Sequence, residues 1–359
     1  TFTNANWNNA QTVTVTGVDD NIIDGNINTT ITMSVDDDNS DNNFDALADQ
    51  TVTATTTDDD TAGFTLSTTT ATVTEAASTA TFTVVLDAQP DSDVVISVTS
   101  GDTGEATVSA ANLTFTNGNW NSAQTVTVTG VDDNLVDGSV NTTITMAVVD
   151  ASSDDNFDDV ANQTVTATTT DNDTAGFTLS KTTATVSEGA DTDTYTVVLN
   201  AQPDSDVVIT VTSADTGEVT VSAAELTFTN GNWNSAQTVT LTGVDDNLVD
   251  GSVNTLVTMA VKDASSDDNF DGVSDQTVTV TTTDNDTAGF TLSSTTATVT
   301  EAAGGGNTAT YTVVLNAQPD SDVVISVTSA DTGEVTVSSG TLTFTNANWN
   351  NAQTVTVTG

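Results

Sequence analysis

Acidic residues that recur at fixed spacing are the side chains of this sequence best suited to chemistry. The segment VDDNLVDG spans Val131 to Gly138, an acidic DND triplet spans Asp171 to Asp173, and a single Glu75 precedes both. Carboxylate and carbonyl oxygens without His or Cys suit calcium, which binds them at about 2.3 to 2.6 Å, better than zinc or a redox metal. Magnesium tolerates irregular, many-ligand sites poorly. The residue types therefore indicate calcium binding, provided that the fold brings these segments together.

Each acidic segment belongs to a tandem repeat. The loop segment returns as VDDNIIDG at 18–25 and as VDDNLVDG at 244–251, the triplet at 58–60 and 284–286, and the glutamate at Glu188 and Glu301. The four Trp residues lie 113, 113 and 116 residues apart, which is the signature of one duplicated module. We expect four modules, two of them partial, at residues 1–60, 61–173, 174–286 and 287–359.

The two ends of the sequence are alike. The string TFTNANWNNAQTVTVTG opens it at residues 1–17 and closes it at residues 343–359, as in a window from a longer array. The last Trp interval is longer because AAGGGN at Ala302 to Asn307 replaces a shorter segment. Insertions are tolerated in surface loops, so we expect a surface loop there.

Within residues 61–173 apolar residues alternate with Thr at a period of two, which indicates β-strands throughout. The AQPDSD segment at residues 88–93 has the Pro and Asp of a tight turn. We expect an all-β fold of tandem, immunoglobulin-like, seven-stranded antiparallel sandwiches joined end to end. The expected strands of this module are residues 64–75, 79–86, 93–99, 105–116, 123–129, 141–149 and 163–170.

The order of these strands places the acidic segments at one end of the sandwich. If the first strand runs upward, the connections after the first, third and fifth strands and the exit of the seventh all lie at the top. Two like charges about 4 Å apart repel by roughly 1 kcal/mol even in water, so several converging carboxylates need a cation. Because the seventh strand leads into the next module, this end is also the expected junction between modules.

The charge balance of the whole chain is extreme. Fifty-one acidic residues face two Lys, with no Arg and no His, for a formal net charge of −49. Nucleic acid and anionic lipid need a basic counterpart, so neither is an expected partner. Solubility or adaptation to high salt is an alternative reason for the acidity, but the acids gather in a few loops while the strands carry neutral Thr. No apolar run is long enough to span a membrane.

Catalysis is not expected of this composition. The sequence has no His to act as a general base and no Cys nucleophile, and neither Lys181 nor Lys262 lies in a repeated motif. Paired carboxylates can cleave glycosides, but here they recur in the same form along the chain, as a structural device would.

The order of the motifs resembles the Calx-β module, a sandwich found in sodium/calcium exchangers, integrin β4 and many large bacterial surface proteins. The resemblance rests on FTLS followed by VTE, on NLTF and TLTF segments, on the DDNLVDG loop and on the closing DND triplet, and it covers the whole array. It implies that calcium ligands come from these loops and from one Leu carbonyl. This chain has Asn172 and Asn285 in the middle of the triplet, so we expect fewer or weaker ions per module than in the exchangers.

The resemblance assigns the ligands module by module. In residues 61–173 they are Glu75, Asp102, Asp132, Asp133, the carbonyl of Leu135, Asp137, Asp171 and Asp173. In residues 174–286 they are Glu188, Asp215, Asp245, Asp246, the carbonyl of Leu248, Asp250, Asp284 and Asp286. The partial modules retain Asp19, Asp20, Asp24, Asp58 and Asp60 at the start, and Glu301 and Asp331 at the end.

Together these features lead us to expect a non-catalytic, extracellular array on a bacterial surface, a fibre or adhesin stalk stiffened by Ca²⁺. Its expected partners are neighbouring modules, other copies of the chain, and cell-surface or matrix components. Two alternatives stay open. Thr ladders such as TVTVT could form a recognition surface for ice, glycans or a partner, or subunits could polymerise into a filament by strand exchange.

Overall fold

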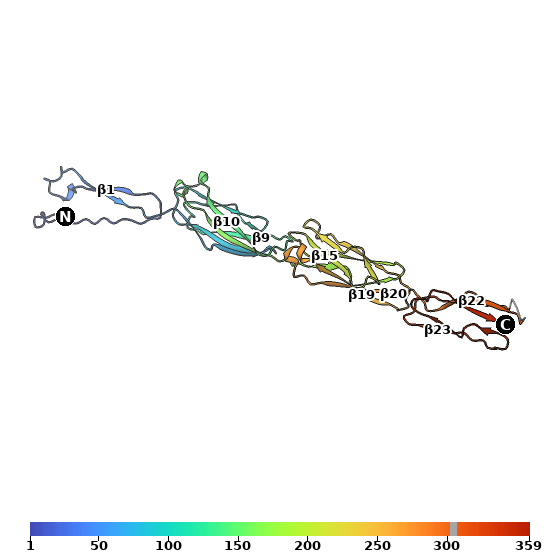
Figure 1. Cartoon of the computed structure of the whole chain (residues 1–359). Helices are drawn as coiled ribbons and strands as arrows, with labels where there is room; N and C mark the ends of the chain where they lie inside the picture. The colour runs from blue at the N-terminus through green and yellow to red at the C-terminus, as the bar shows by residue number, and fades with distance from the viewer. Residues whose placement is uncertain (302–306) are drawn as a thin grey trace. The chain divides into compact units, whose positions relative to one another are not determined.

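The computed structural model describes residues 1–301 and 307–359, so the surface loop expected at Ala302–Asn307 falls almost wholly outside the described residues. Contacts between residues divide the chain into two compact units. The first unit holds residues 1–133 and 137–172, and the second holds residues 134–136 and 173–359. Each unit is described by itself, and both can be followed by colour in Figure 1.

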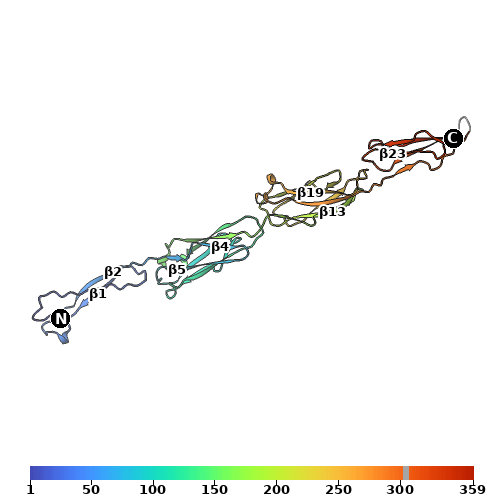
Figure 2. The ribbon, with the colours of Figure 1, turned by 90° about the horizontal axis from the view of Figure 1, so that it is seen from below.

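The first unit contains a complete sandwich of two sheets, one strand of each being labelled in Figure 2 (β5 and β4). In spatial order, the antiparallel sheet has β3 (Phe64–Leu66), β5 (Thr79–Leu86), β9 (Gln124–Gly130) and β7 (Ala106–Val108). The other sheet has β4 (Thr70–Thr74), β11 (Gln163–Thr170), β10 (Val140–Val148), β6 (Val94–Ser100) and β8 (Asn112–Phe115).

The alternation of Thr with apolar residues gives each strand one buried face. In β9, Val126 and Val128 are fully buried, whereas Thr127 between them is only partly buried. Phe82 from the first sheet and Ile144 from the second join Val126 in one core. Complete burial of such a side chain contributes about 1.5–3 kcal/mol, so apolar packing holds the two sheets face to face.

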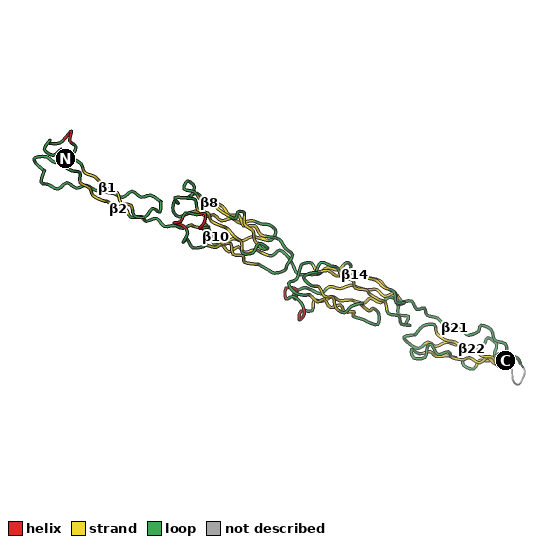
Figure 3. Tube along the Cα trace, turned by 90° about the horizontal axis from the view of Figure 1, so that it is seen from above, coloured by secondary structure: helices red, strands yellow, loops and turns green. Residues whose placement is uncertain are grey.

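The remainder of the first unit is a hairpin and three short helices. The hairpin pairs β1 (Ile27–Met33) with β2 (Gln50–Thr56), in antiparallel register. The helices are single 3₁₀ turns, drawn in red in Figure 3: η1 (Asp37–Asn39), η2 (Asp150–Ser152) and η3 (Asp155–Phe157).

The second unit repeats the sandwich and adds two further sheets. One sheet of its sandwich has β12 (Phe177–Leu179), β14 (Thr192–Leu199), β18 (Gln237–Gly243) and β16 (Val219–Val221). The other has β13 (Thr183–Ser187), β20 (Gln276–Thr283), β19 (Val253–Val261), β15 (Val207–Ser213) and β17 (Glu225–Phe228). Two 3₁₀ turns, η4 (Asp263–Ser265) and η5 (Asp268–Phe270), follow β19. The further sheets are β21 (Phe290–Leu292), β22 (Thr308–Leu315), β26 (Gln353–Thr358) and β24 (Thr336–Val337), then β23 (Val323–Ser326) with β25 (Thr341–Phe344). Within the described residues, none of these helices has the length and apolar character that crossing a membrane requires.

The expected fold class, tandem all-β sandwiches, is confirmed, with three differences in detail. The expected first strand, residues 64–75, is two strands, β3 and β4, which belong to different sheets. The expected fourth strand, residues 105–116, is likewise divided into β7 and β8. In addition, β4 pairs with β11 in parallel, although the sandwich was expected to be antiparallel throughout.

The first strand divides because the chain crosses from one sheet to the other within three residues. The N–H of Ser67 still donates to Thr83 on β5, at 3.0 Å. Two residues later the carbonyl of Thr69 accepts from Thr166 on β11, at 2.9 Å. Between them the hydroxyl of Thr68 hydrogen-bonds the backbone of the residue two positions on, which stabilises the crossing.

Candidate metal centre

Parallel pairing of β13 with β20 brings three acids of the second unit together. Ser187 pairs with Thr283, and the next residue, Glu188, donates its N–H to the Thr283 carbonyl at 3.2 Å. Parallel neighbours end at the same edge, so Glu188 after β13 meets Asp284 and Asp286 after β20. One carboxylate oxygen from each of the three lies within 4.8 Å of the other two.

A second group of acids in the same unit lies on two further connections between the sheets. Glu218 immediately precedes β16, and Asp246 and Asp250 lie in the β18–β19 loop. The N–H of Val244 donates to the Glu218 carbonyl at 2.9 Å and so ties that loop to the start of β16. Oxygens of Glu218, Asp246 and Asp250 also lie within 4.8 Å of one another. The charges of Asp246 and Asp250 act on Glu188 as well, so the two groups form one acidic centre.

A glycine allows the two sheets to approach closely beneath this centre. A Cβ on Gly243, at the end of β18, would lie 2.1 Å from the carbonyl oxygen of Ser187, at the end of β13. Gly130 occupies the same position against Thr74 in the first unit, where a Cβ would lie 2.2 Å from the carbonyl oxygen. The missing side chain therefore lets the end of β13 or β4, and the glutamate that follows it, approach the loop acids.

Hydrogen bonds hold each VDDNLVDG loop against the closing triplet. Asp284 accepts the N–H of Gly251 at Oδ2, at 2.9 Å, and the N–H of Asp286 at Oδ1, at 2.7 Å. Asp171 accepts from Gly138 in the same way, at 2.9 Å. The two glycines have φ values of 77° and 75°, a conformation that residues with a Cβ rarely adopt. The last residue of the loop is therefore a glycine for a conformational reason.

The Asn of the closing triplet links the other two acidic segments. In the second unit, the N–H of Asn285 donates to Oε2 of Glu188 at 3.3 Å. The side-chain Nδ2 of the same residue donates to Oδ1 of Asp245 at 3.0 Å. One neutral residue thus holds carboxylates from two different connections.

The first unit repeats the arrangement around Glu75. Asn172 donates its N–H to Oε2 of Glu75 at 3.2 Å and its Nδ2 to Oδ1 of Asp132 at 3.0 Å. Oxygens of Glu75 and Asp171, together with one of Asp173 two residues further along the chain, lie within 4.8 Å of one another. Among the described residues, these three and the two groups of the second unit are the acidic clusters with this spacing.

Burial is the main cause of the raised pKa values of the glutamates in and near these groups. Only 1% of Glu75 is exposed, and this burial, with the charges of Asp171, Asp133 and Asp137, raises its pKa to about 7 in spite of the hydrogen bond from Asn172. Burial, followed by neighbouring charges, also raises the pKa of Glu105, Glu188 and Glu218. Ionised carboxylates are therefore unfavourable here without a positive partner.

The donor atoms fit a hard cation. Oε2 of Glu105 and Oδ2 of Asp286 are buried and have no hydrogen-bond partner among the described residues. A buried acceptor left in this state costs about 1–3 kcal/mol, and more when it is charged. The potential ligands are all oxygens, from several short loops and without nitrogen or sulfur, which suits calcium in an irregular site.

Not every acid assigned from the sequence joins these groups. Asp102, Asp215 and Asp331 are exposed, and Oδ1 of each accepts the N–H of the glycine two residues on, at 2.8, 2.8 and 2.9 Å. Each therefore stabilises its own turn. Glu301 is also exposed. Leu135 and Leu248, expected as carbonyl ligands, form isolated β-bridges with Gln202 and Gln318.

The acid that the sequence assignment passed over is the glutamate three residues after each of these aspartates. Glu105 and Glu218 are buried, and Glu218 belongs to an acidic group where Asp215 does not. The repeated TGE at residues 103–105 and 216–218 was the available signal, because a charged residue directly before a buried strand position needs a partner.

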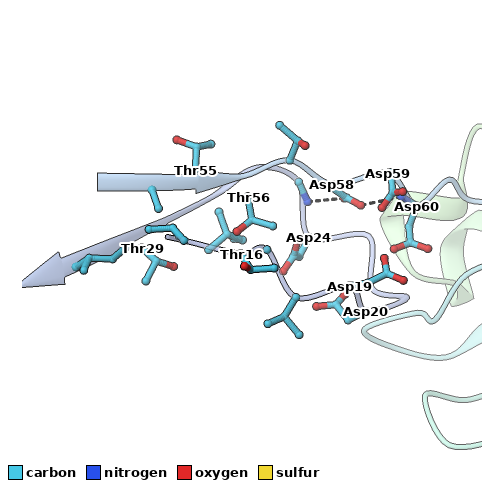
Figure 4. A pocket seen from close by; sticks show the side chains of 18 residues that line it. Thr16, Asp19, Asp20, Asp24, Thr29, Thr55, Thr56, Asp58, Asp59 and Asp60 are labelled. Carbon is cyan, nitrogen blue, oxygen red and sulfur yellow. Dashed lines mark hydrogen bonds between the residues drawn. The ribbon is translucent and has the colours of Figure 1, made fainter. Parts of the chain in front are cut away.

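The acids of the first module lie at one end of an open cavity, shown in Figure 4. The cavity has a volume of about 830 Å³ and is lined by parts of residues 15–31 and 54–60. Asp58 accepts the N–H groups of Gly25 and Asp60, at 2.7 and 2.9 Å, and these bonds lower its pKa. Among the described residues of this module, no three acids form a group with the 4.8 Å spacing, although the cavity lining includes Asp19, Asp20, Asp24, Asp58 and Asp60.

Comparisons with known proteins return solved structures of low similarity only. No protein-family model matches the chain, and no curated protein matches it. Similar solved structures include CBD12 from CALX1.2, at 16% identity over 55% of this chain and 80% of that one, with a TM-score of 0.25. The S-layer protein SbsC domains 4 and 5 match at 16% identity over 56% and 82% of the two chains, with a TM-score of 0.27. Because these similarities are so low, the function of the acidic centre has to be argued from its own geometry.

Proposed function

We propose that this chain is a non-catalytic structural array whose modules bind Ca²⁺ at the acidic end of each sandwich. It would serve as an extracellular surface fibre or adhesin stalk that calcium stiffens. The observation that carries the proposal is the acidic centre of the second unit, where six carboxylates from four connections form two groups with oxygens within 4.8 Å.

The electrostatics of this centre support a divalent ion. Glu188 is 1% exposed and receives one backbone hydrogen bond, which cannot balance the charges of Asp246, Asp284 and Asp250 around it. The chain offers only two Lys as internal counter-ions, and both form ion pairs elsewhere, with Asp193 and Glu225. At a pH where these carboxylates are ionised, a bound cation is the available means of neutralising the centre.

The weakness expected of such a site supports an extracellular location. Asn285 replaces a third acid in the triplet, which lowers the charge available to the ion. Extracellular modules bind calcium with Kd of about 10⁻⁴ to 10⁻³ M, which the millimolar calcium outside cells fills. The same acids recur without a general base, nucleophile or phosphate loop, which favours a structural role over catalysis.

Isothermal titration calorimetry of the whole chain tests the proposal. We expect calcium to bind, and magnesium to bind much more weakly because it requires near-ideal octahedral geometry. Glu188→Gln should remove binding at one centre, whereas Asp263→Asn, which removes an equal charge from an exposed position outside the acidic groups, should leave it intact. Absence of calcium binding by the unmodified chain would refute the proposal.

A further inference from the structure

The three middle residues of each VDDNLVDG loop contact the module that follows. We call these residues the loop tip: Asn21–Ile23, 134–136 and 247–249. In the first unit, Ile22 forms a parallel β-bridge with Gln89, and the N–H of Gln89 donates to the carbonyl of Asn21 at 2.7 Å. The side chain of Asn156 donates to the carbonyl of Ile23 at 3.2 Å. The tip of one module is thus held by the backbone and a side chain of the next.

The second unit contains the same contact. Its tip, residues 134–136, bridges Gln202 through Leu135, and the N–H of Gln202 donates to the Asn134 carbonyl at 2.7 Å. The N–H of Val136 returns a bond to the Gln202 carbonyl at 3.2 Å, and Nδ2 of Asn269 donates to the Val136 carbonyl at 2.6 Å. Both recognition groups, a Gln in the turn and an Asn in η3 or η5, recur 113 residues apart.

The last residue of the tip adds apolar packing. Ile23 packs against the core of the sandwich in residues 61–173, and Val136 packs against the core of the sandwich in residues 174–286. The third tip forms the same kind of bridge with its turn, between Leu248 and Gln318. In the first two contacts, the bridge to the turn, the bond from the Asn and one apolar side chain therefore act together.

The surface that receives the tip is held in place by its own module. Nε2 of Gln89 donates to the carbonyl of Asn117 at 3.1 Å, and Nδ2 of Asn117 donates to the carbonyl of Pro90 at 3.2 Å. Asp154 accepts the N–H of Ser92 at 2.9 Å, so a third loop supports the same turn. Because these bonds lie within one module, the receiving surface is ordered before the tip binds, which lowers the entropic cost of docking.

The tip itself is attached at both ends to the acidic centre. At the third tip, residues 247–249, Asp246 precedes the tip and its Oδ1 accepts the N–H of Leu248 at 2.6 Å. Asp250 directly follows the same tip. Gly251, next along, donates to Asp284. Repulsion between unneutralised acids therefore acts directly on the two ends of the tip.

We propose that the loop tip is a docking segment whose partner is the proline-containing turn of the following module, and that an ion in the acidic centre fixes the tip in its docking conformation. This inference rests on the proposed calcium site. It assigns the stiffening to a defined contact and not to shared metal ligands. By thermodynamic reciprocity, docking must then strengthen calcium binding by the same factor by which calcium strengthens docking.

A distance measurement across one complete contact tests this inference. The chain has no Cys, so Thr114→Cys and Thr227→Cys, at exposed positions in consecutive modules, accept two spin labels for pulsed electron paramagnetic resonance. We call this doubly labelled chain the parent. In the parent, the distribution of distances between the two labels should be narrower with calcium than with chelator. Val136→Ser should lose most of that narrowing, bind the same number of ions, and bind them roughly fivefold or more weakly. Asn269→Ala should act in the same direction.

The matched control is Val140→Thr, a partly exposed valine four residues beyond the tip. It should retain both the narrowing and the calcium affinity of the parent. Equal narrowing in the parent and in Val136→Ser would overturn the docking inference while leaving the calcium site intact. A parent that binds no calcium would instead refute the proposed function. In that case, the widths of the distance distributions of the parent and of Val136→Ser in chelator would show whether the tip docks without an ion.

Discussion

Asn285 donates its backbone N–H to the buried Oε2 of Glu188 at 3.3 Å, across 97 residues of sequence. Its side chain simultaneously holds Asp245, so the two acids remain close without a positive charge between them. The sequence alone suggested that Asn here merely lowers the charge of the site. In the structure it is the residue that connects the closing triplet with both other acidic segments.

Asn285→Asp should destabilise the chain in chelator. The change removes an amide donor to a carboxylate and adds a further negative charge to the centre. Loss of a hydrogen bond to a charged group costs about 1.5–3 kcal/mol. Scanning calorimetry in chelator should show the lowered transition. Asn285→Ala is the control, because it removes the donor without adding charge and should be less harmful. An unchanged transition in Asn285→Asp would show that the acids are not close in solution.

Gly251→Ala should weaken both folding and calcium binding. The φ of 77° at this position costs a residue with a Cβ about 1–2 kcal/mol, even though a Cβ would meet no atom within 4 Å. Gly272→Ala is the matched control, since its Cβ would also meet nothing within 4 Å and its φ is not in the left-handed region. Calorimetry should show a lower unfolding temperature for Gly251→Ala than for Gly272→Ala. Equal stability of the variants would contradict the backbone argument.

Calcium should oppose the pH dependence that Glu75 gives to the stability of the calcium-free chain. The pKa of Glu75 is about 7 in the folded state and near 4.5 when unperturbed, so the folded state binds this proton more tightly than the unfolded state. In chelator, its contribution to stability is therefore full below about pH 4.5 and is lost as the pH rises through about 7. Calcium competes with the proton, so the stabilisation by calcium should grow over the same interval. Melting temperatures between about pH 5 and pH 8 provide the measurement, and Glu75→Gln should flatten both trends.

Removal of calcium should lower the melting temperature by a predictable amount. At a hundredfold excess over Kd, one site that binds only the folded state contributes about 2.7 kcal/mol. In a domain of roughly a hundred residues this corresponds to a rise in melting temperature of roughly 10–20 °C. Calorimetry with calcium, with magnesium and with chelator should give an increase for calcium alone. An equal increase with both ions would indicate general screening of charge and no specific site.

Most strands could be predicted because one side chain in two must be apolar to build the core. The expected segments 79–86 and 163–170 coincide with β5 and β11. The division at Ser67 to Thr69 could not be predicted, because the alternation continues through the crossing and does not record which sheet a strand joins. For the same reason the parallel pairing of β4 with β11 was not visible in the sequence.

The sequence predicted which connections form the acidic centre, but not which acid of each connection takes part. Loop order alone brings the connections around Glu75, 100–105, 131–138 and 171–173 to one end. Which acid of a connection points inward depends on local backbone geometry. Asp102 accepts a hydrogen bond within its own turn, from Gly104, while Glu105, directly before a buried strand position, is itself buried.

The parallel pairing of β4 with β11 has a mechanical consequence. In the first complete sandwich, the chain passes through the short β3 into β4 and leaves directly after β11, so β4 and β11 carry the load once β3 has been pulled away. Tension along the chain pulls the start of one strand and the end of its parallel neighbour in opposite directions, so their hydrogen bonds are loaded side by side and must break together. A module built in this way resists extension more strongly than one whose terminal strands can be peeled apart bond by bond.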